Sequence, residues 1–131
     1  MTSLRVLVVD DEPDVRLLLR LQLETNGHHV TGEAADGEEA LAACRLDPPD
    51  IMILDLLMPG TNGFEVIPRL RADFPDVAVI AYTAVAGDFV RNEMARLRIP
   101  LVLKTAHFAP LERALRAAMD QRSSTDPSGR S

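Results

Sequence analysis

The sequence predicts an α/β fold in which helices cover both faces of a five-stranded parallel sheet, a doubly wound arrangement. The apolar run from Ile51 to Leu54 shows no alternation with polar residues, which is typical of a strand buried on both faces. Strand-like and helix-like segments alternate five times, which favours parallel pairing. With 131 residues, 47% hydrophobic and 26% charged, the composition indicates one ordinary globular domain.

The elements follow from short apolar runs and from the residues that end them. Pro13 suits the first turn of a helix, and Gly27 suits a left-handed cap at its end. Pro68 is close enough to the start of its helix to be tolerated. The predicted strands are 5–9, 29–34, 51–54, 77–82 and 101–103, and the predicted helices are 13–26, 38–46, 64–74, 88–97 and 110–119.

Several apolar and titratable side chains receive specific assignments. In the first helix we expect one inward stripe, and Leu17 with Leu21 forms a second stripe that we interpret as a wider buried face rather than an exposed ridge. Cys44 is predicted to be a small core residue. Residues 4–120 form the predicted domain, and residues 121–131, rich in Ser with Pro and Gly, are predicted to be a disordered tail or linker stub. The inward stripe comprises Val15, Leu18, Leu19 and Gln22, and the three histidines His28, His29 and His107 are predicted at the surface or at caps.

Four of the five predicted strands end in a reactive residue. These are Asp10 with Asp11 after the first strand, Asp55 after the third, Thr83 after the fourth and Lys104 after the fifth. In a doubly wound sheet of strand order 2-1-3-4-5, these four strands are neighbours, and their carboxyl ends meet at one edge. We therefore expect one site that contains three carboxylates, a hydroxyl and an ammonium.

Three crowded carboxylates repel one another unless a cation lies between them. Oxygen ligands favour a hard dication such as Mg²⁺, and no Cys or His cluster accompanies the acids to favour Zn²⁺. A net charge of -6 argues against nucleic acid as a direct partner. No apolar run approaches the roughly 20 residues of a membrane span. The single Cys44 excludes an internal disulfide and fits a reducing cytoplasm.

This pattern resembles the receiver domain of two-component response regulators, the phosphoacceptor module typified by the chemotaxis regulator. The residues that carry the resemblance are Asp10-Asp11, the run from Asp55 to Pro59 with Gly63, Thr83-Ala84, and Lys104. The resemblance covers about residues 4–120, and although each motif alone is weak, the combination in this order is highly specific.

The resemblance implies a role for each of these residues. Asp55 would accept a phosphoryl group from a phosphohistidine, and Asp11, supported by Asp10, would bind Mg²⁺ together with Asp55. The backbone carbonyl of Leu57 would complete the metal ligands. The remaining residues would contact the phosphoryl oxygens: Lys104 as a point charge, Thr83 through its hydroxyl, and Ala84 through its amide.

The implied partners are a sensor histidine kinase or histidine phosphotransfer protein, a downstream effector domain or target protein, and a second copy of the chain. The exposed-ridge alternative for Leu17 and Leu21 would dock a helix of the kinase or phosphotransfer protein. The domain would be cytoplasmic, would bind neither nucleic acid nor membrane, and would not turn over an external substrate as an enzyme. The alternative function is a dimerisation or scaffold module that works without phosphorylation.

Two other classes fit less well. A flavodoxin-like FMN carrier needs a hydroxyl- and Gly-rich phosphate loop where this chain has Asp10-Asp11-Glu12. A haloacid-dehalogenase-type phosphatase carries a second Asp two residues after its nucleophile, where this chain has Leu57.

The chain departs from the family pattern at the predicted output surface. Leu101 occupies the position of a switching Tyr or Phe, and Thr105 follows Lys104 where the family normally has Pro. A cis Lys104–Thr105 bond would cost roughly 2.5–4 kcal/mol, so we predict a trans bond. We also hypothesise that the apolar side chains of Leu57 and Val85 hinder the hydrolytic water and lengthen the lifetime of an acyl phosphate; the alternative is that they pack against loop neighbours.

Overall fold

The computed structural model describes residues 3–60, 62–84, 86–105 and 107–124. Strands and helices alternate throughout this part of the chain, as the sequence predicts. The bounds in chain order are β1 Arg5–Val9, α1 Pro13–Thr25, β2 His29–Ala34, α2 Gly37–Leu46, β3 Ile51–Leu54, α3 Gly63–Asp73, β4 Ala78–Thr83, α4 Asp88–Leu97, β5 Leu101–Leu103 and α5 Ala109–Ser124.

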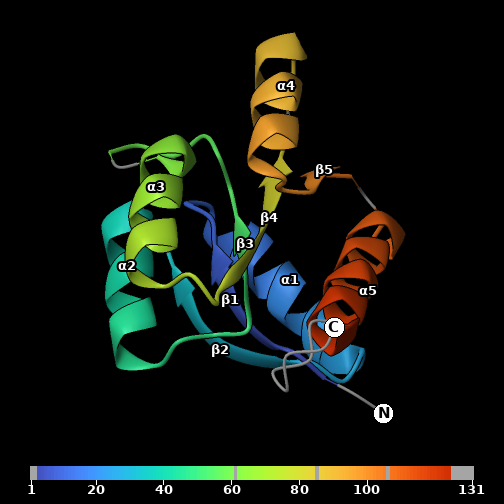
Figure 1. Ribbon diagram of the computed structural model, residues 1–131. Coiled ribbons are helices and arrows are strands. Elements are labelled where there is room, and N and C mark those ends of the chain that lie inside the picture. Colours follow the sequence, from blue (N-terminus) through green and yellow to red (C-terminus); the bar gives the residue numbers. More distant parts are fainter. Residues whose placement is uncertain (1–2, 61, 85, 106, 125–131) are drawn as a thin grey trace.

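The five strands form one parallel sheet in the order β2-β1-β3-β4-β5, which confirms the predicted topology. The central strand β3 pairs with β1 from Val6 opposite Ile51 to Val9 opposite Leu54. On its other side β3 pairs with β4, and the short β5 pairs with only the last part of β4. Figure 1 shows the sheet between two layers of helices. The carboxyl ends of β1, β3, β4 and β5 therefore lie along one edge.

Each face of the sheet has its own hydrophobic core. On one face α1 and α5 pack through Leu19, Leu23, Leu111 and Leu115. On the other face α2 and α3 pack, and Cys44 is fully buried there, as predicted. Every side chain of β3 from Ile51 to Leu54 is buried, because helices cover both sides of this strand.

The helix ends follow the local chemistry of the sequence. Asn62 and Glu65 form a reciprocal capping box at the start of α3, in which each side chain accepts a hydrogen bond from the other residue's amide. Asp36 caps α2 by accepting a bond from the amide of Glu39. After α1, Gly27 takes a φ of 88°, the left-handed conformation predicted for it. The caps at Asp36 and Asn62 fix where the loops that follow β2 and β3 end.

Two predictions about the inner face of α1 are wrong. Leu18 was expected to face inward but is 53% exposed, and Leu17 and Leu21 are 55% and 54% exposed rather than part of a wider buried face. The buried positions of α1 are Leu19 and Leu23, four residues apart. Consecutive helical residues are turned by about 100°, so a stripe through Leu19 and Leu23 leaves these three leucines in solvent.

The prediction that His28 is a surface or cap residue is also wrong. His28 is 6% exposed, and its Nδ1 accepts a hydrogen bond of 3.2 Å from the Leu4 amide. Its Nε2 lies 3.8 Å from the Glu112 carboxylate on α5. His29 and His107 are exposed, as predicted. A histidine between a helix and a strand can point to either side of the backbone, and here it is enclosed beneath α5.

At the carboxyl end of the chain, α5 continues to Ser124, beyond its predicted end at about Met119. Residues 121–124, predicted to belong to a disordered tail, are therefore helical, and residues 125–131 lie outside the described part of the chain. The Lys104–Thr105 bond is trans, as predicted, since none of the described peptide bonds is cis. Among the described residues, no helix combines the length and the low polarity that spanning a membrane requires.

Helix α4 and the short strand β5 are less enclosed than the rest of the fold. Met94 is the buried side chain of α4, while Phe89 is 72% exposed and lies 6.2 Å, between ring centroids, from Phe64 on α3. In Figure 1, α4 rises from the edge of the sheet rather than lying along it. Arg98 ends α4 with a φ of 58°, a left-handed conformation that costs a non-glycine residue about 1–2 kcal/mol.

Candidate functional site

The reactive residues lie together where the strands end. Asp10 follows β1, Asp55 follows β3, Thr83 ends β4 and Lys104 follows β5. The Asp55 amide donates a 2.9 Å hydrogen bond to the Val9 carbonyl, and the Lys104 amide donates a 2.8 Å bond to the Thr83 carbonyl. The sheet hydrogen bonds therefore continue one residue past the strands and hold these four residues on a rigid edge.

Three carboxylates converge at this edge, as the sequence predicts. Asp10, Asp11 and Asp55 each offer a carboxylate oxygen, and the three oxygens lie within 4.8 Å of one another. Asp10 is 1% exposed and Asp55 is 4% exposed. Oδ2 of Asp10 is buried and accepts no hydrogen bond from the other described residues apart from its ion pair with Lys104. Buried carboxylates in this arrangement need a cation to offset their repulsion.

Lys104 is the cation that the chain itself supplies. Its Nζ lies 2.6 Å from Oδ2 of Asp10 and 3.2 Å from Oδ2 of Asp55. Burial alone would lower the pKa of the Lys104 ammonium, but the hydrogen bond with Asp10 and the charges of both carboxylates raise that pKa above its ordinary value. The Nζ also lies 5.9 Å from the ring centroid of Tyr82, within the range of a cation–π contact. Lys104 is therefore charged and bridges the ends of β1 and β3.

Asp55 is held by groups on both of its carboxylate oxygens. Oδ1 accepts a 3.1 Å hydrogen bond from the Leu57 amide, and Oδ2 faces Lys104. Burial raises the pKa of the Asp55 carboxyl above its ordinary value, while the Leu57 amide and Lys104 act in the opposite direction. A carboxylate that is partly desolvated and fixed in orientation is suited to nucleophilic attack.

Gly63 keeps the loop after Asp55 close to the site. A Cβ at Gly63 would lie 2.8 Å from the Leu56 Cα and 2.9 Å from the Asp55 carbonyl oxygen, closer than real Cβ atoms approach. The Gly63 amide donates a 3.2 Å hydrogen bond to the Leu56 carbonyl. Any larger residue at position 63 would displace the backbone of Asp55 and Leu56.

The donor set at this edge fits a magnesium ion. It consists of three carboxylates from Asp10, Asp11 and Asp55, which are the oxygen ligands that Mg²⁺ prefers, and Asp11 is only half-buried. The buried Oδ2 of Asp10 is an acceptor that a dication could satisfy better than a single ammonium. Neither histidine nor cysteine joins this cluster among the described residues, which disfavours Zn²⁺.

The remaining predicted contacts stay predictions. Thr83 is buried at the end of β4, and Ala84 follows it with an exposed side chain. Leu57 adjoins Asp55 through its amide, and its side chain is 59% exposed, so the alternative that it packs against loop neighbours is not favoured. Val85, the other residue predicted to shield the site, lies outside the described residues.

The sequence reasoning missed one residue that contacts the acid cluster and a second that holds the first in place. Arg16 of α1 donates a 2.6 Å hydrogen bond from Nη1 to the Asp10 carbonyl, and Glu33 of β2 pairs with Arg16. The second strand was predicted to end in residues without a chemical role. The sequence offered one signal for these contacts: a single acid in β2, Glu33, and two arginines four residues apart on α1, Arg16 and Arg20.

A comparison with known families identifies the family to which the chain belongs. A family model described as "Response regulator receiver domain" matches residues 6–116. Response regulator MprA of Mycobacterium bovis is 44% identical over 95 residues, which cover 72% of this chain and 40% of that protein. Response regulator GacA of Pseudomonas viridiflava is 40% identical over 86 residues, covering 65% and 40%. The chain thus spans about two fifths of the length of these relatives.

Solved structures show the same similarity. The response regulator protein TrrA from Thermotoga maritima, solved in complex with Mg²⁺-BeF, has a TM-score of 0.78 and is 33% identical, with 90% of this chain and 99% of that chain covered. A two-component response regulator of the LuxR family from Aurantimonas has a TM-score of 0.84 at 30% identity, covering 92% and 87%. The chain therefore belongs to the family of response regulator receiver domains of two-component systems.

Proposed function

We propose that the chain is a phosphoacceptor that takes a phosphoryl group onto Asp55 in a Mg²⁺-dependent reaction. The observation that carries this proposal is the position of the Asp55 carboxylate, which faces the Lys104 ammonium at 3.2 Å and belongs to a cluster of three acids. The Mg²⁺-BeF complex of the TrrA relative supports it. Membership of the family alone would leave open whether this chain retains the reaction.

In the proposed reaction an Asp55 carboxylate oxygen attacks the phosphorus atom of a phosphohistidine. The new O–P bond forms an acyl phosphate, the P–N bond breaks, and its electron pair returns to the imidazole. The Leu57 amide orients Asp55, and Lys104 pairs with a phosphoryl oxygen. Thr83 would donate its hydroxyl to a second oxygen, with the Ala84 amide nearby.

The proposed Mg²⁺ ligands are Asp10, Asp11, Asp55 and the Leu57 carbonyl. When bound there, the metal screens the negative charges of the carboxylate and the incoming phosphoryl group. In the chain itself, Lys104 bridges Asp10 and Asp55. Phosphorylation would draw Lys104 from Asp10 toward the phosphoryl group, and this charge movement would bias the loop after Thr83 and the position of α4.

The decisive experiment is intact-protein mass spectrometry after incubation with acetyl phosphate, with Mg²⁺ or with a chelator. We expect a mass gain of one phosphoryl group that requires both Mg²⁺ and Asp55. Asp55→Asn removes the nucleophile with little change in shape, and Asp11→Asn keeps the nucleophile but weakens the proposed metal site. A chain that gains no phosphoryl group would instead support a scaffold or dimerisation role.

The exposed leucines of α1 supply the proposed docking surface for the phosphoryl donor. Leu17, Leu18 and Leu21 are all more than half exposed on the helix that begins directly after Asp10-Asp11-Glu12. An apolar patch at i, i+1 and i+4 suits a helix of a sensor histidine kinase or a histidine phosphotransfer protein. An effector domain, a target protein or a second copy would receive the signal, in the cytoplasm.

This docking proposal has its own test. Leu21→Ser should slow phosphotransfer from the cognate phosphohistidine protein at least severalfold and leave the reaction with acetyl phosphate unchanged, because the small donor needs no docking surface. Leu46→Ser is the matched control, since Leu46 is 88% exposed at the end of α2. Equal slowing by both variants, or slowing with acetyl phosphate, would contradict the assignment.

A further inference from the structure

The amide, the carbonyl and one carboxylate oxygen of Asp10 each make a hydrogen bond. Its amide donates a 3.0 Å hydrogen bond to the Ala34 carbonyl at the end of β2, and its carbonyl accepts a 2.6 Å bond from Nη1 of Arg16. Its carboxylate Oδ1 accepts a 2.9 Å bond from the Glu12 amide. The orientation of Asp10, and of Asp11 which follows it, therefore depends on groups outside the acid cluster.

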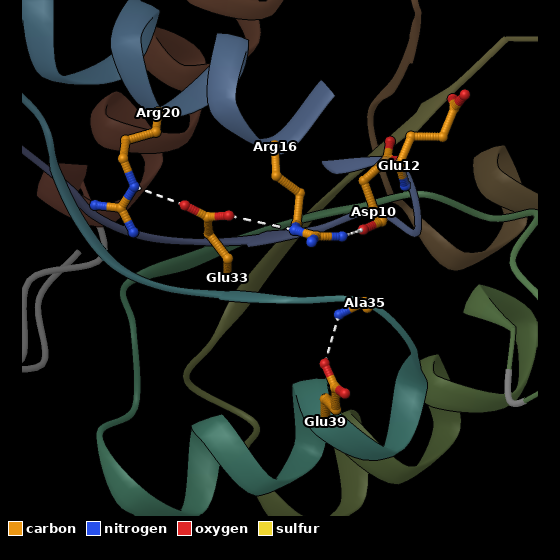
Figure 2. Close-up of polar contacts among 7 residues, drawn as sticks. All are labelled: Asp10, Glu12, Arg16, Arg20, Glu33, Ala35 and Glu39. Atoms are coloured by element: carbon orange, nitrogen blue, oxygen red, sulfur yellow. Dashed lines mark hydrogen bonds and ion pairs between the residues drawn. The ribbon is translucent and has the colours of Figure 1, made fainter. Parts of the chain in front are cut away.

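Arg16 is itself fixed by the neighbouring strand. Its Nε lies 3.2 Å from Oε1 of Glu33, and Oε2 of the same carboxylate lies 2.7 Å from Nε of Arg20. The hydrogen bond from Arg20 is the main reason that the pKa of Glu33 is lowered. Figure 2 shows Glu33 between the two arginines, with Arg16 reaching on to Asp10. The side chain of Arg16 is only 18% exposed, so its guanidinium has little freedom to leave.

The far side of β2 is anchored as well. The Ala35 amide donates a 2.8 Å hydrogen bond to Oε1 of Glu39 on α2, which Figure 2 also shows. The strand that carries Glu33 and accepts from the Asp10 amide is thus tied to α2. By contrast, the Glu12 side chain makes no capping hydrogen bond to α1. Arg16 therefore links the first turns of α1 to the loop that holds the acids.

From these contacts we infer that Arg16 is a positioning residue for the metal-binding acids, acting through the Asp10 carbonyl and held in place by Glu33. The inference rests on the proposed function, since it concerns the Mg²⁺ affinity of the cluster. Groups that hold metal ligands in orientation typically change metal affinity by about 10–100-fold when they are removed.

The sign of the effect separates this role from simple electrostatics. Arg16 is a cation near three acids, so Coulomb repulsion alone predicts that its removal would strengthen Mg²⁺ binding. Positioning predicts the opposite, because a released Asp10 carbonyl lets the Asp10-Asp11 loop turn away. Arg20 provides a matched comparison. It binds Glu33 as Arg16 does, but its hydrogen bonds go to Glu33 and Glu24 and not to Asp10.

The experiment measures Mg²⁺ affinity by isothermal titration calorimetry of the unphosphorylated protein. Arg16→Gln should bind Mg²⁺ about tenfold more weakly than the wild type. Arg20→Gln should stay within about twofold, because Arg16 keeps its own bond to the Asp10 carbonyl and its contact with Glu33. Arg16→Lys, which keeps the charge but loses the planar fork, should fall between the wild type and Arg16→Gln. Unchanged or tighter binding by Arg16→Gln would overturn the inference.

A second measurement needs no metal and separates this inference from the proposed function. Amide hydrogen exchange of Glu12, which donates to the Asp10 carboxylate, should accelerate in Arg16→Gln and remain unchanged in Arg20→Gln. If the wild type binds no Mg²⁺, the proposed metal site fails, and the exchange rates alone decide whether Arg16 orders Asp10. Equal exchange in all variants would overturn the positioning role even if Asp55 is phosphorylated normally.

Discussion

The acid cluster and the region of α4 and β5 lie along the same edge of the sheet but are held very differently. Asp10 is fixed through its amide, its carbonyl and its carboxylate, and Asp55 through its amide and both carboxylate oxygens. In α4, Met94 is the buried side chain, and β5 has only three residues. Local stability follows the density of buried contacts. The comparison indicates that the proposed chemistry resides on rigid backbone and the proposed response on a loosely packed helix.

The largest effect that we expect on the rigid side comes from removing its internal cation. Lys104→Met leaves the buried Asp10 and Asp55 carboxylates without their counter-ion, so metal-free protein should lose about 3 kcal/mol of unfolding free energy at neutral pH. Saturating Mg²⁺ should restore part of that loss. Urea unfolding in chelator and in Mg²⁺ measures both values.

The control for Lys104 is an ion pair on the surface. Arg116 pairs with Glu112 but its side chain is 70% exposed, so Arg116→Met should change the unfolding free energy by less than about 1 kcal/mol. Losses of similar size for Lys104→Met and Arg116→Met would contradict the view that the acid cluster is the tightly coupled part of the molecule.

Two glycines sharpen the comparison. Gly63→Ala forces a Cβ against the backbone of Leu56 and Asp55, and we expect a loss of about 2 kcal/mol, measured by denaturant unfolding, with slower phosphorylation of Asp55. At Gly87, before α4, a Cβ would meet nothing within 4 Å, so Gly87→Ala should be nearly neutral. Equal losses at the two positions would show that the loosely packed region is as constrained as the site.

Strain in the loosely packed region can be relieved. Arg98 holds a φ of 58° at the end of α4 with an exposed side chain, so Arg98→Gly should raise the unfolding free energy by about 1 kcal/mol. Arg96→Gly, inside the last turn of the same helix, should lower it by about 1 kcal/mol. Thermal unfolding of the pair tests the sign, and a loss in both variants would rule out backbone strain at Arg98.

The smallest expected effect concerns the lifetime of the acyl phosphate. The exposed Leu57 side chain beside Asp55 hinders water in our hypothesis, so Leu57→Asn should dephosphorylate about threefold faster, equivalent to about 0.7 kcal/mol of activation free energy. Loss of the mass increment with time gives the rate. Leu46→Asn is the control on α2, and an unchanged rate in Leu57→Asn would remove the hypothesis.

Much of the fold was predictable because it depends on local patterns. The run from Ile51 to Leu54 identified the central strand, and the acids at Asp10, Asp11 and Asp55 were correctly expected to meet at one edge. The alternation of strands and helices predicted a parallel sheet, and the strand order expected of a doubly wound fold, 2-1-3-4-5, is the one observed. These predictions succeed because an apolar run without alternation identifies a buried parallel strand. The residue that ends the run then marks the carboxyl end of that strand, where sites of such sheets lie.

The misses arise where several side chains satisfy the same pattern. In α1 the leucines run almost all round the helix, so periodicity could not decide between the faces of Leu18 and Leu19, and packing against the sheet selected Leu19. The burial of His28 depends on α5, a helix distant in the sequence. The Arg16 contact is to a backbone carbonyl, an acceptor that every residue carries and that leaves no trace in the sequence.

The pairing of His28 with Glu112 gives α5 a fixed point near its first turn. The 16 residues from Ala109 to Ser124 form a rod about 24 Å long at 1.5 Å per residue. With Glu112 beside the enclosed imidazole, a tilt of only about 5° imposed at the β5 end would displace Ser124, about 18 Å along the helix from Glu112, by about 1.6 Å. In mechanical terms, α5 would then act as a lever that pivots at the His28 contact.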